Sequence, residues 1–297
     1  MLNVIISLFA ILIQLPLVVS AKELPPMLGT RYDIGGYKVH LYCQGHGAPT
    51  VIIDAGLGDD SWDWQDIVKS ASNKTQTCVY DRPGYGWSDV GPRPRTSRQI
   101  ATELGLLLLE AQLPPPYILV GHSFGGYNMR LFAASHPEDV VGLVLVEASH
   151  EGQYDQLDIK LPPPNKGQRN IFVAIPLDKM NAGDPKDYSL RDRAFRSASY
   201  EIAALSQSTE QVKQSGGIPT VPLIVISRGK PEWYGNENAT KREKIWINLQ
   251  RDLTHLSPIS EHIFANHSGH DVPKDQPEII IDAIANVIDL AQLIKSP

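Results

Sequence analysis

A serine lies between two glycines in the segment Gly121-His122-Ser123-Phe124-Gly125. The apolar run Tyr117-Ile118-Leu119-Val120 precedes it, and a helical pattern begins at Gly126. A sharp turn from a strand into a helix needs small residues around the serine, because the backbone there is strained and the two elements approach closely. Such a turn presents the hydroxyl at its tip, as a nucleophilic serine requires. We therefore predict that Ser123 is a nucleophile.

A serine hydroxyl is a poor nucleophile until a base accepts its proton, so a histidine should lie at the end of a later strand. Residues Ser260 to Asn266 have the pattern of such a strand, and the loop His267-Ser268-Gly269-His270-Asp271 follows. The stretch Asp275-Gln276-Pro277-Glu278 then opens a helix that continues to about Leu293. His270 is therefore the candidate general base.

The glycine-flanked serine, the Ser-Gly-His loop and the Asp-Gln-Pro-Glu stretch together resemble the α/β-hydrolase superfamily, and most closely its esterase-like and lipase-like members. The resemblance extends from about Tyr32 to about Leu293 and is weakest between about His150 and Gly217. It implies an α/β-hydrolase fold with a mostly parallel central sheet flanked by helices. It also implies a single domain over residues 22–297, with a small helical cap inserted at about residues 151–217.

The alternation of short apolar runs with longer helical patterns agrees with that fold, because it is typical of a parallel sheet covered by helices on both faces. A capping pattern at Thr96 and Gln99 predicts the start of a helix that runs to about Gln112. The strands predicted before the last one are Tyr37 to Gln44, Thr50 to Asp54, Thr77 to Tyr80, Tyr117 to Gly121, Val140 to Val146 and Val221 to Ile226.

A carboxylate should orient the histidine, and the sequence offers three candidates. Most superfamily members place this acid after the strand predicted to end at Ile226, where Glu232 is the only nearby carboxylate. Some relatives carry it after the preceding strand, where this chain has Glu147. A carboxylate directly after an apolar run is poorly solvated unless a partner such as a histidine N–H binds it. We predict Glu147 as the acid, with Glu232 as the second candidate and Asp252 as the third.

Negative charge that develops on a carbonyl oxygen during attack is stabilised by fixed backbone N–H donors. The resemblance implies one donor after the nucleophile and one in the loop after the third strand, which correspond to Phe124 and Leu57. The family often has His-Gly where this chain has Ala55-Gly56. The alternative is that this loop is a plain strand-to-helix turn.

The segment Asp81-Arg82-Pro83-Gly84-Tyr85-Gly86-Trp87-Ser88 resembles another hallmark loop of the superfamily. We expect its charged pair to brace the loop and to take no part in chemistry.

Composition narrows the range of partners. The chain has 297 residues and a formal net charge of −6, and its 27 lysines and arginines form no basic run, so a nucleic-acid partner is not expected. The histidines lack metal-ligand spacing and no dinucleotide-binding fingerprint is present, so we expect neither a metal nor a cofactor.

The first residues have the pattern of a targeting segment. Leu2 to Val19 is almost wholly apolar and ends in Val19-Ser20-Ala21 before the charged Lys22-Glu23. Small residues at Val19 and Ala21 suit cleavage of a signal peptide over residues 1–21, which predicts secretion without stable membrane association. An uncleaved N-terminal anchor is the alternative, since the segment carries no lysine or arginine at its start and could just span a bilayer.

Two further features of the sequence are relevant to the predicted secretion. Three N-glycosylation triplets begin at Asn73, Asn238 and Asn266, and the last lies so close to the His270 loop that we expect it to be unmodified. The only two cysteines, Cys43 and Cys78, fall on strands that the family's sheet order makes neighbours. A disulfide between them and two unpaired buried thiols are both compatible with the sequence.

Together these features predict a secreted serine hydrolase that acts on small-molecule acyl substrates, and most simply on carboxylic esters, through an acyl-enzyme. An aminopeptidase-like amide hydrolase, a cyanohydrin lyase with the same triad and a hydrolase-derived small-molecule receptor are the alternatives. Dehalogenases and epoxide hydrolases of this superfamily carry an aspartate at the turn where this chain has Ser123.

Overall fold

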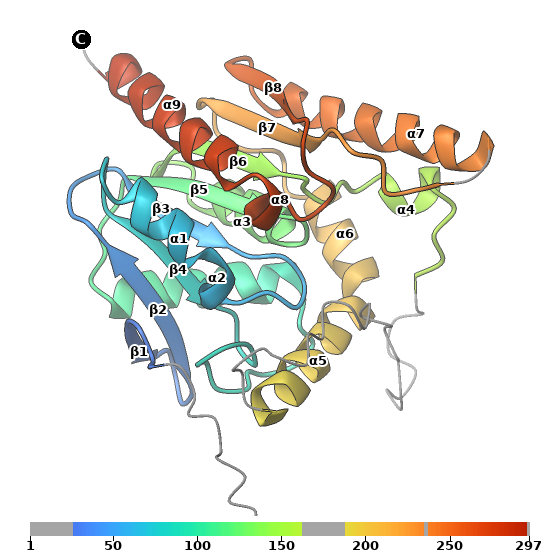
Figure 1. Cartoon of the computed structure of the whole chain (residues 1–297). Coiled ribbons are helices and arrows are strands. Elements are labelled where there is room, and N and C mark those ends of the chain that lie inside the picture. The colour runs from blue at the N-terminus through green and yellow to red at the C-terminus, as the bar shows by residue number, and fades with distance from the viewer. Residues whose placement is uncertain (1–25, 162–187, 235–236, 296–297) are drawn as a thin grey trace, which may run out of the picture.

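The computed structural model of the chain describes residues 26–161, 188–234 and 237–295. These residues build an eight-stranded sheet in the order β1-β2-β4-β3-β5-β6-β7-β8 (Figure 1). The pairs β1–β2 and β2–β4 are antiparallel, and all other neighbouring strands are parallel. The fold is therefore the predicted α/β-hydrolase fold. The strands are β1 (Thr30–Asp33), β2 (Lys38–Gln44), β3 (Thr50–Asp54), β4 (Thr77–Asp81), β5 (Tyr117–His122), β6 (Val140–Val146), β7 (Leu223–Arg228) and β8 (Ser260–Ala265).

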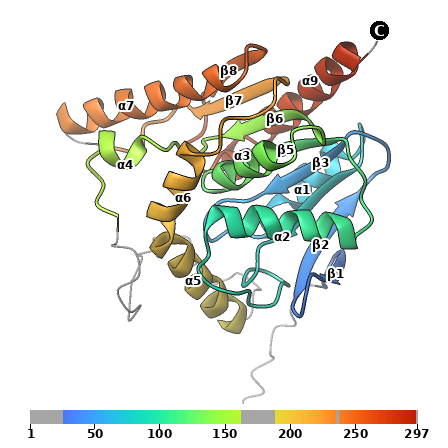
Figure 2. The ribbon, with the colours of Figure 1, turned by 180° about the vertical axis from the view of Figure 1, so that it is seen from behind.

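Helices cover both faces of this sheet. Figure 1 shows α1 (Ser61–Ala71) and α9 (Pro277–Lys295) in front of it, and Figure 2 shows α2 (Ser97–Glu110) and α3 (Gly125–Ser135) on the opposite face. The side chain of Thr96 accepts a hydrogen bond from the Gln99 N–H at 3.3 Å, so α2 begins where the capping pattern predicts. The remaining helices are α4 (Gln153–Gln156), α5 (Tyr188–Ala203), α6 (Leu205–Lys213), α7 (Glu237–Leu253), the 3₁₀ turn η2 (Thr254–Leu256) and α8 (Val272–Asp275).

The core consists of two apolar layers separated by the sheet. Along β5, Ile118 and Val120 pack into the layer under α1 and α9, whereas Leu119 packs into the layer under α2 and α3. Side chains of a strand alternate between its faces, so a continuous apolar run fills both layers at once. This explains why the central strands are recognisable in the sequence as unbroken apolar segments.

Strand β7 differs from its predicted bounds, Val221 to Ile226. Pro222 lacks an N–H and stands just outside the strand, while Ser227 and Arg228 extend it by pairing with β8. A buried arginine at the end of a strand is tolerated because carboxylates bind it, as described below. Strand β1 is a further difference, since its short sequence carries no clear apolar pattern and it was not predicted.

Between β6 and β7 the chain forms α4, α5 and α6, within the region where the cap is expected. Helix α6 packs against α2 and α3, and α5 packs against α6. Residues 162–187 of this region and the whole expected signal segment lie outside the described residues. No helix among the described ranges is long and apolar enough to cross a membrane.

A disulfide joins Cys43 to Cys78. The two residues face each other in register on the antiparallel strands β2 and β4, and their Cα atoms are 4.0 Å apart. The bridge therefore links the antiparallel edge of the sheet to its parallel centre.

We predict that replacing both cysteines by alanine lowers the free energy of unfolding by about 4 kcal/mol, since the bridge closes a loop with a sequence separation of 35 in the unfolded chain. Urea unfolding of the oxidised wild type and the double variant measures this difference. A reductant should lower the wild-type midpoint and leave that of the double variant unchanged. Equal midpoints for the two oxidised proteins would contradict the prediction.

Candidate active site

Ser123 occupies the tip of the turn between β5 and α3. Its backbone φ is 52°, in the left-handed region that a residue with a side chain rarely adopts. The Ser123 N–H donates to the Val146 carbonyl at 3.0 Å, and the Ser123 carbonyl accepts from the Ser149 N–H at 2.9 Å. The end of β6 thus holds the strained turn from the side. The side chain of Ser123 is half-buried, so a substrate can reach it.

The small residues around the serine permit a close approach of strand and helix. A Cβ atom at Gly121 would lie 2.8 Å from backbone atoms of Gly126, and one at Gly126 would lie 2.6 Å from the side chain of Ala148. Contacts this short do not occur in folded proteins, so any side chain at either position forces the strand, the helix or β6 apart.

Ser123, His270 and Glu147 come together at the carboxyl edge of the parallel strands. His270 Nε2 lies 3.0 Å from Ser123 Oγ, and His270 Nδ1 lies 3.2 Å from Glu147 Oε2. A carboxylate accepts hydrogen bonds only, so Nδ1 must carry the proton that it donates to Glu147. The neutral imidazole then has its lone pair on Nε2, where it accepts the hydroxyl proton of Ser123.

Glu147 is fully buried, and its backbone φ is 45°. Besides His270, its carboxylate accepts from the Arg228 backbone N–H and guanidinium, both at 2.7 Å, and from Trp246 Nε1 at 3.0 Å and 3.1 Å. Burial alone raises the pKa of a carboxyl group, but the hydrogen bond from His270, the positive charge of that ring when both of its nitrogens carry a proton, and the charge of Arg228 hold the pKa of Glu147 below its ordinary value. Glu147 is therefore ionised at neutral pH.

Arg228, Trp246 and Glu243 are site residues that sequence reasoning missed. The Arg228 guanidinium also donates to Glu243 at 3.0 Å and lies 5.1 Å from the centre of the Trp246 ring. One signal was available in the sequence, because Arg228 stands close to the place where most family members carry the acid. A cation there suits a chain whose acid comes from the neighbouring strand.

The other two carboxylates bind elsewhere. Glu232 accepts from the backbone N–H of His270 at 2.8 Å and so holds the histidine loop rather than the imidazole. Asp252 accepts from His150 Nε2 at 3.0 Å and lies 3.2 Å from His255 Nδ1. Of the three candidate acids, all of which lie within the described residues, only Glu147 contacts the His270 ring.

His122, which directly precedes Ser123, contacts the backbone of the histidine loop. Its Nε2 lies 2.9 Å from the His270 carbonyl oxygen, and the two rings are 5.1 Å apart between centres. The histidine loop therefore has two polar anchors, the Glu232 carboxylate on its N–H and the His122 ring on its carbonyl.

The loop after β3 lies against the turn that carries Ser123. A Cβ atom at Gly125 would lie 2.3 Å from the Asp54 carbonyl oxygen, and Leu57 packs against the apolar layer that contains Phe124. Within the described residues, no hydrogen bond takes up the N–H group of Leu57 or of Phe124. The two backbone N–H groups that the sequence predicts as oxyanion donors are therefore available to bind a substrate oxygen.

Asp81 and Arg82 both bind buried groups, but each has its own partners. Asp81 lies 2.7 Å from His40 Nδ1 and accepts from the backbone of Ser61 and Trp87. The Arg82 guanidinium binds Asp54 and Glu201. Asp81 and Arg82 therefore do not pair with each other as expected, and the loop is braced by three buried charged contacts, one made by Asp81 and two made by Arg82.

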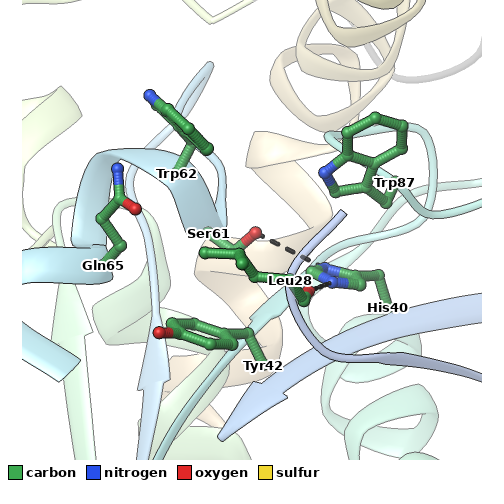
Figure 3. A pocket seen from close by; sticks show the side chains of 7 residues that line it. All are labelled: Leu28, His40, Tyr42, Ser61, Trp62, Gln65 and Trp87. Atoms are coloured by element: carbon green, nitrogen blue, oxygen red, sulfur yellow. Dashed lines mark hydrogen bonds between the residues drawn. The ribbon is translucent and has the colours of Figure 1, made fainter. Parts of the chain in front are cut away.

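A small hollow near the first described residues is lined by a second serine and histidine that contact each other, Ser61 and His40 (Figure 3). Ser61 Oγ lies 3.4 Å from His40 Nδ1, the same atom that faces Asp81, and His40 Nε2 binds the Leu28 carbonyl oxygen. Burial lowers the pKa of His40, but the hydrogen bond and charge of Asp81 outweigh it and raise that pKa. Each ring nitrogen faces an oxygen of Asp81 or Leu28 that can only accept a hydrogen bond, so His40 offers Ser61 no lone pair.

Among the described residues, no group of three or more histidine, cysteine, aspartate or glutamate side chains is arranged to hold a metal ion.

Several known proteins are similar in sequence to this chain. Residues 49–179 match the family described as alpha/beta hydrolase fold. The chain is 28% identical to YqjL of Bacillus subtilis over 86% of this chain and 90% of that protein. It is 23% identical to an AB hydrolase superfamily protein of Gibberella zeae, over 82% of this chain and 87% of that protein. Two longer relatives are spanned over only 42% and 54% of their lengths.

Among solved structures, the enol-lactonase from Burkholderia xenovorans matches with a TM-score of 0.61 and 16% identity, over 88% of this chain and 100% of that one. A thermophilic esterase from Thermogutta terrifontis matches with a TM-score of 0.59 and 16% identity, over 88% and 98% of the two chains. At such low identity, this likeness establishes a common fold.

Proposed function

Because the chain belongs to the α/β-hydrolase fold superfamily, we propose that it is a serine hydrolase that cleaves carboxylic esters of small molecules. The observation that carries the proposal is the continuous line of contacts from Ser123 Oγ through His270 to Glu147, with distances of 3.0 Å and 3.2 Å. A serine at the turn favours acyl transfer over epoxide opening, for which the family uses an aspartate. Nucleophile, base and orienting acid are the parts that acyl transfer requires.

In the first half of the reaction, Ser123 Oγ attacks the acyl carbon while His270 Nε2 accepts the hydroxyl proton. Glu147 stabilises the imidazolium that forms, and it can do so because its own pKa is held low. The N–H groups of Leu57 and Phe124 bind the oxyanion of the tetrahedral intermediate. His270 then gives its proton to the leaving alcohol, and the acyl group remains on Ser123.

In the second half, water replaces the alcohol. His270 Nε2 accepts a proton from that water as it attacks the acyl carbon, and the same two N–H groups stabilise the second oxyanion. Collapse of the intermediate releases the carboxylic acid, and the proton returns from His270 to Ser123 Oγ. Every step uses groups of this chain.

We also propose that the protein is secreted after cleavage of residues 1–21. The disulfide Cys43–Cys78 supports an oxidising compartment, and the exposed Asn73 and Asn238 suit glycosylation. Exposed Asn266 directly follows β8, and a glycan there would crowd the His270 loop, so we expect it to stay unmodified.

We predict that the mature protein begins at Lys22 or within a residue or two of it, because Val19-Ser20-Ala21 suits the peptidase. Mass spectrometry of protein collected from the culture medium measures the first residue. Membrane-bound protein that retains Met1 would show an uncleaved anchor instead.

Ser123→Ala should abolish both covalent labelling by a fluorophosphonate probe and turnover of aryl esters, because no other group can carry the acyl chain. Thermal unfolding should change little. Ser61→Ala is the matched control. Ser61 also lies close to a histidine, but both ring nitrogens of that residue, His40, face acceptor oxygens and neither can take the serine proton. Labelling that survives Ser123→Ala, or that disappears in Ser61→Ala, would refute the assignment. Labelling of Ser123 without turnover across esters of graded chain length would favour the receptor alternative.

Glu147→Gln should lower kcat by up to about 10⁴-fold, because a neutral amide neither fixes the tautomer of His270 nor stabilises its cation. Glu232→Gln should stay close to wild type, since its amide oxygen can still accept from the His270 N–H. Steady-state kinetics of both variants, with matched thermal unfolding curves, decides between the two carboxylates. The reverse ranking would place the acid at Glu232.

A further inference from the structure

Arg82 lies beneath the loop that follows β3, although it belongs to a different segment. It directly follows β4, and 2% of its side chain is exposed. Its Nη1 donates to Asp54 Oδ1 and to the Ala55 carbonyl oxygen, both at 2.6 Å, and its Nη2 donates to the Gly56 carbonyl oxygen at 2.9 Å. One guanidinium thus binds two successive carbonyl groups of this loop.

The second of these carbonyls belongs to the peptide unit that also contains the Leu57 N–H. A peptide unit is planar, so a donor that fixes the direction of the Gly56 C=O also fixes the direction of the Leu57 N–H on the opposite side. A cationic donor on the oxygen also polarises the unit and strengthens its N–H as a donor. The Arg82 guanidinium lies 5.7 Å from the centre of the Phe124 ring, so it borders the other proposed donor residue as well.

Helix α5 of the inserted region holds this arginine from the other side. Glu201 on α5 is fully buried and accepts from Arg82 Nε at 2.9 Å and from Nη2 at 3.1 Å. The Tyr85 hydroxyl donates to Glu201 Oε2 at 2.7 Å. Arg82 Nη2 therefore bonds both to Glu201 and to the Gly56 carbonyl. A buried guanidinium with carboxylates on two sides has little freedom to turn.

We propose that Arg82 and Glu201 are positioning residues for the oxyanion site, and that α5 acts on catalysis through them. Arg82 sets the plane of the Gly56–Leu57 peptide, and Glu201 sets the guanidinium. The inserted region thereby takes part in the stabilisation of charge in the transition state, in addition to any contact that it makes with substrate. This inference rests on the proposed serine hydrolase function.

Glu201→Gln tests the inference. The amide keeps the size of the side chain and one acceptor oxygen. It removes the negative charge, and its NH₂ group replaces an oxygen that accepts from Arg82 or Tyr85. We expect kcat for an aryl ester to fall by about tenfold, a part of the 10²–10³-fold loss seen when an oxyanion donor is removed outright. KM should stay within about twofold, because the affected interaction strengthens only in the transition state.

Glu103→Gln is the matched control. Glu103 on α2 is 2% exposed and binds the equally buried Arg95 at 2.6 Å and 2.8 Å, so this substitution also takes a carboxylate charge from a buried arginine. Glu103 also accepts hydrogen bonds from Tyr37 and Gln99, and these partners lie outside the loop after β3. Both variants should unfold at lower temperature than wild type, but only Glu201→Gln should lose kcat and affinity for an arylboronic acid, which forms a tetrahedral adduct with a catalytic serine.

If Glu201→Gln fails to fold, Tyr85→Phe removes a single hydrogen bond from Glu201 and should cause a smaller fall in kcat at unchanged KM. An unchanged kcat in the folded variant, a rise in KM alone, or an equal fall in Glu103→Gln would overturn the inference. Fluorophosphonate labelling separates this failure from that of the proposed function. If wild type is labelled at Ser123 and Glu201→Gln keeps its kcat, only the positioning role is lost.

Discussion

The close approach of β5 to α3 at Ser123 is the constraint on which the site depends. The serine is strained, and the backbone hydrogen bonds that hold it come from Val146 at the end of β6 and from Ser149 just after that strand. Glu147 and Ala148, the two residues between these anchors, therefore have little choice of position. The bonds that maintain the strained turn thus also bring the end of β6, and with it a carboxylate, to the side of the turn where the histidine loop arrives.

Such a carboxylate is deeply buried, and an uncompensated buried charge is strongly destabilising. Glu147 is compensated by donors from three other segments, which are Arg228 on β7, Trp246 on α7 and His270 after β8. The charge that the proposed chemistry needs therefore also links the last third of the chain to the sheet. His270 contributes only part of this compensation, so the acid can remain ionised throughout a proton transfer cycle.

A buried charge is also compensated by partners from other segments on the other side of the turn. Arg82 is as buried as Glu147, and its carboxylate partners come from β3 and from α5. The two networks contain charges of opposite sign at their centres, a carboxylate beneath the histidine and a guanidinium beneath the loop after β3. This arrangement suits a reaction in which positive charge develops on an imidazole while negative charge develops on a carbonyl oxygen.

The sequence alone determined those parts of the protein that are encoded over short distances. The glycines around Ser123, the apolar runs of the central strands and the loop at His270 each reflect chemistry within about ten residues, as turns and periodic patterns do. The fold class followed from their order. The short strand β1 and the full extent of β7 were missed because pairing with a neighbouring strand, rather than an apolar pattern, defines them.

Only the tertiary structure decided which groups neutralise one another. Trp246 reaches Glu147 across a sequence separation of 99, and Arg82 reaches Glu201 across 119, with no pattern in the chain to indicate either pair. Burial made these pairings necessary, because a charge in the interior must find a partner that the fold places beside it. The sequence could therefore name the serine, the histidine and three possible acids. The contacts of the acids were decided by the packing of β6, β7 and α7, since distance along the chain carries no information about distance in space.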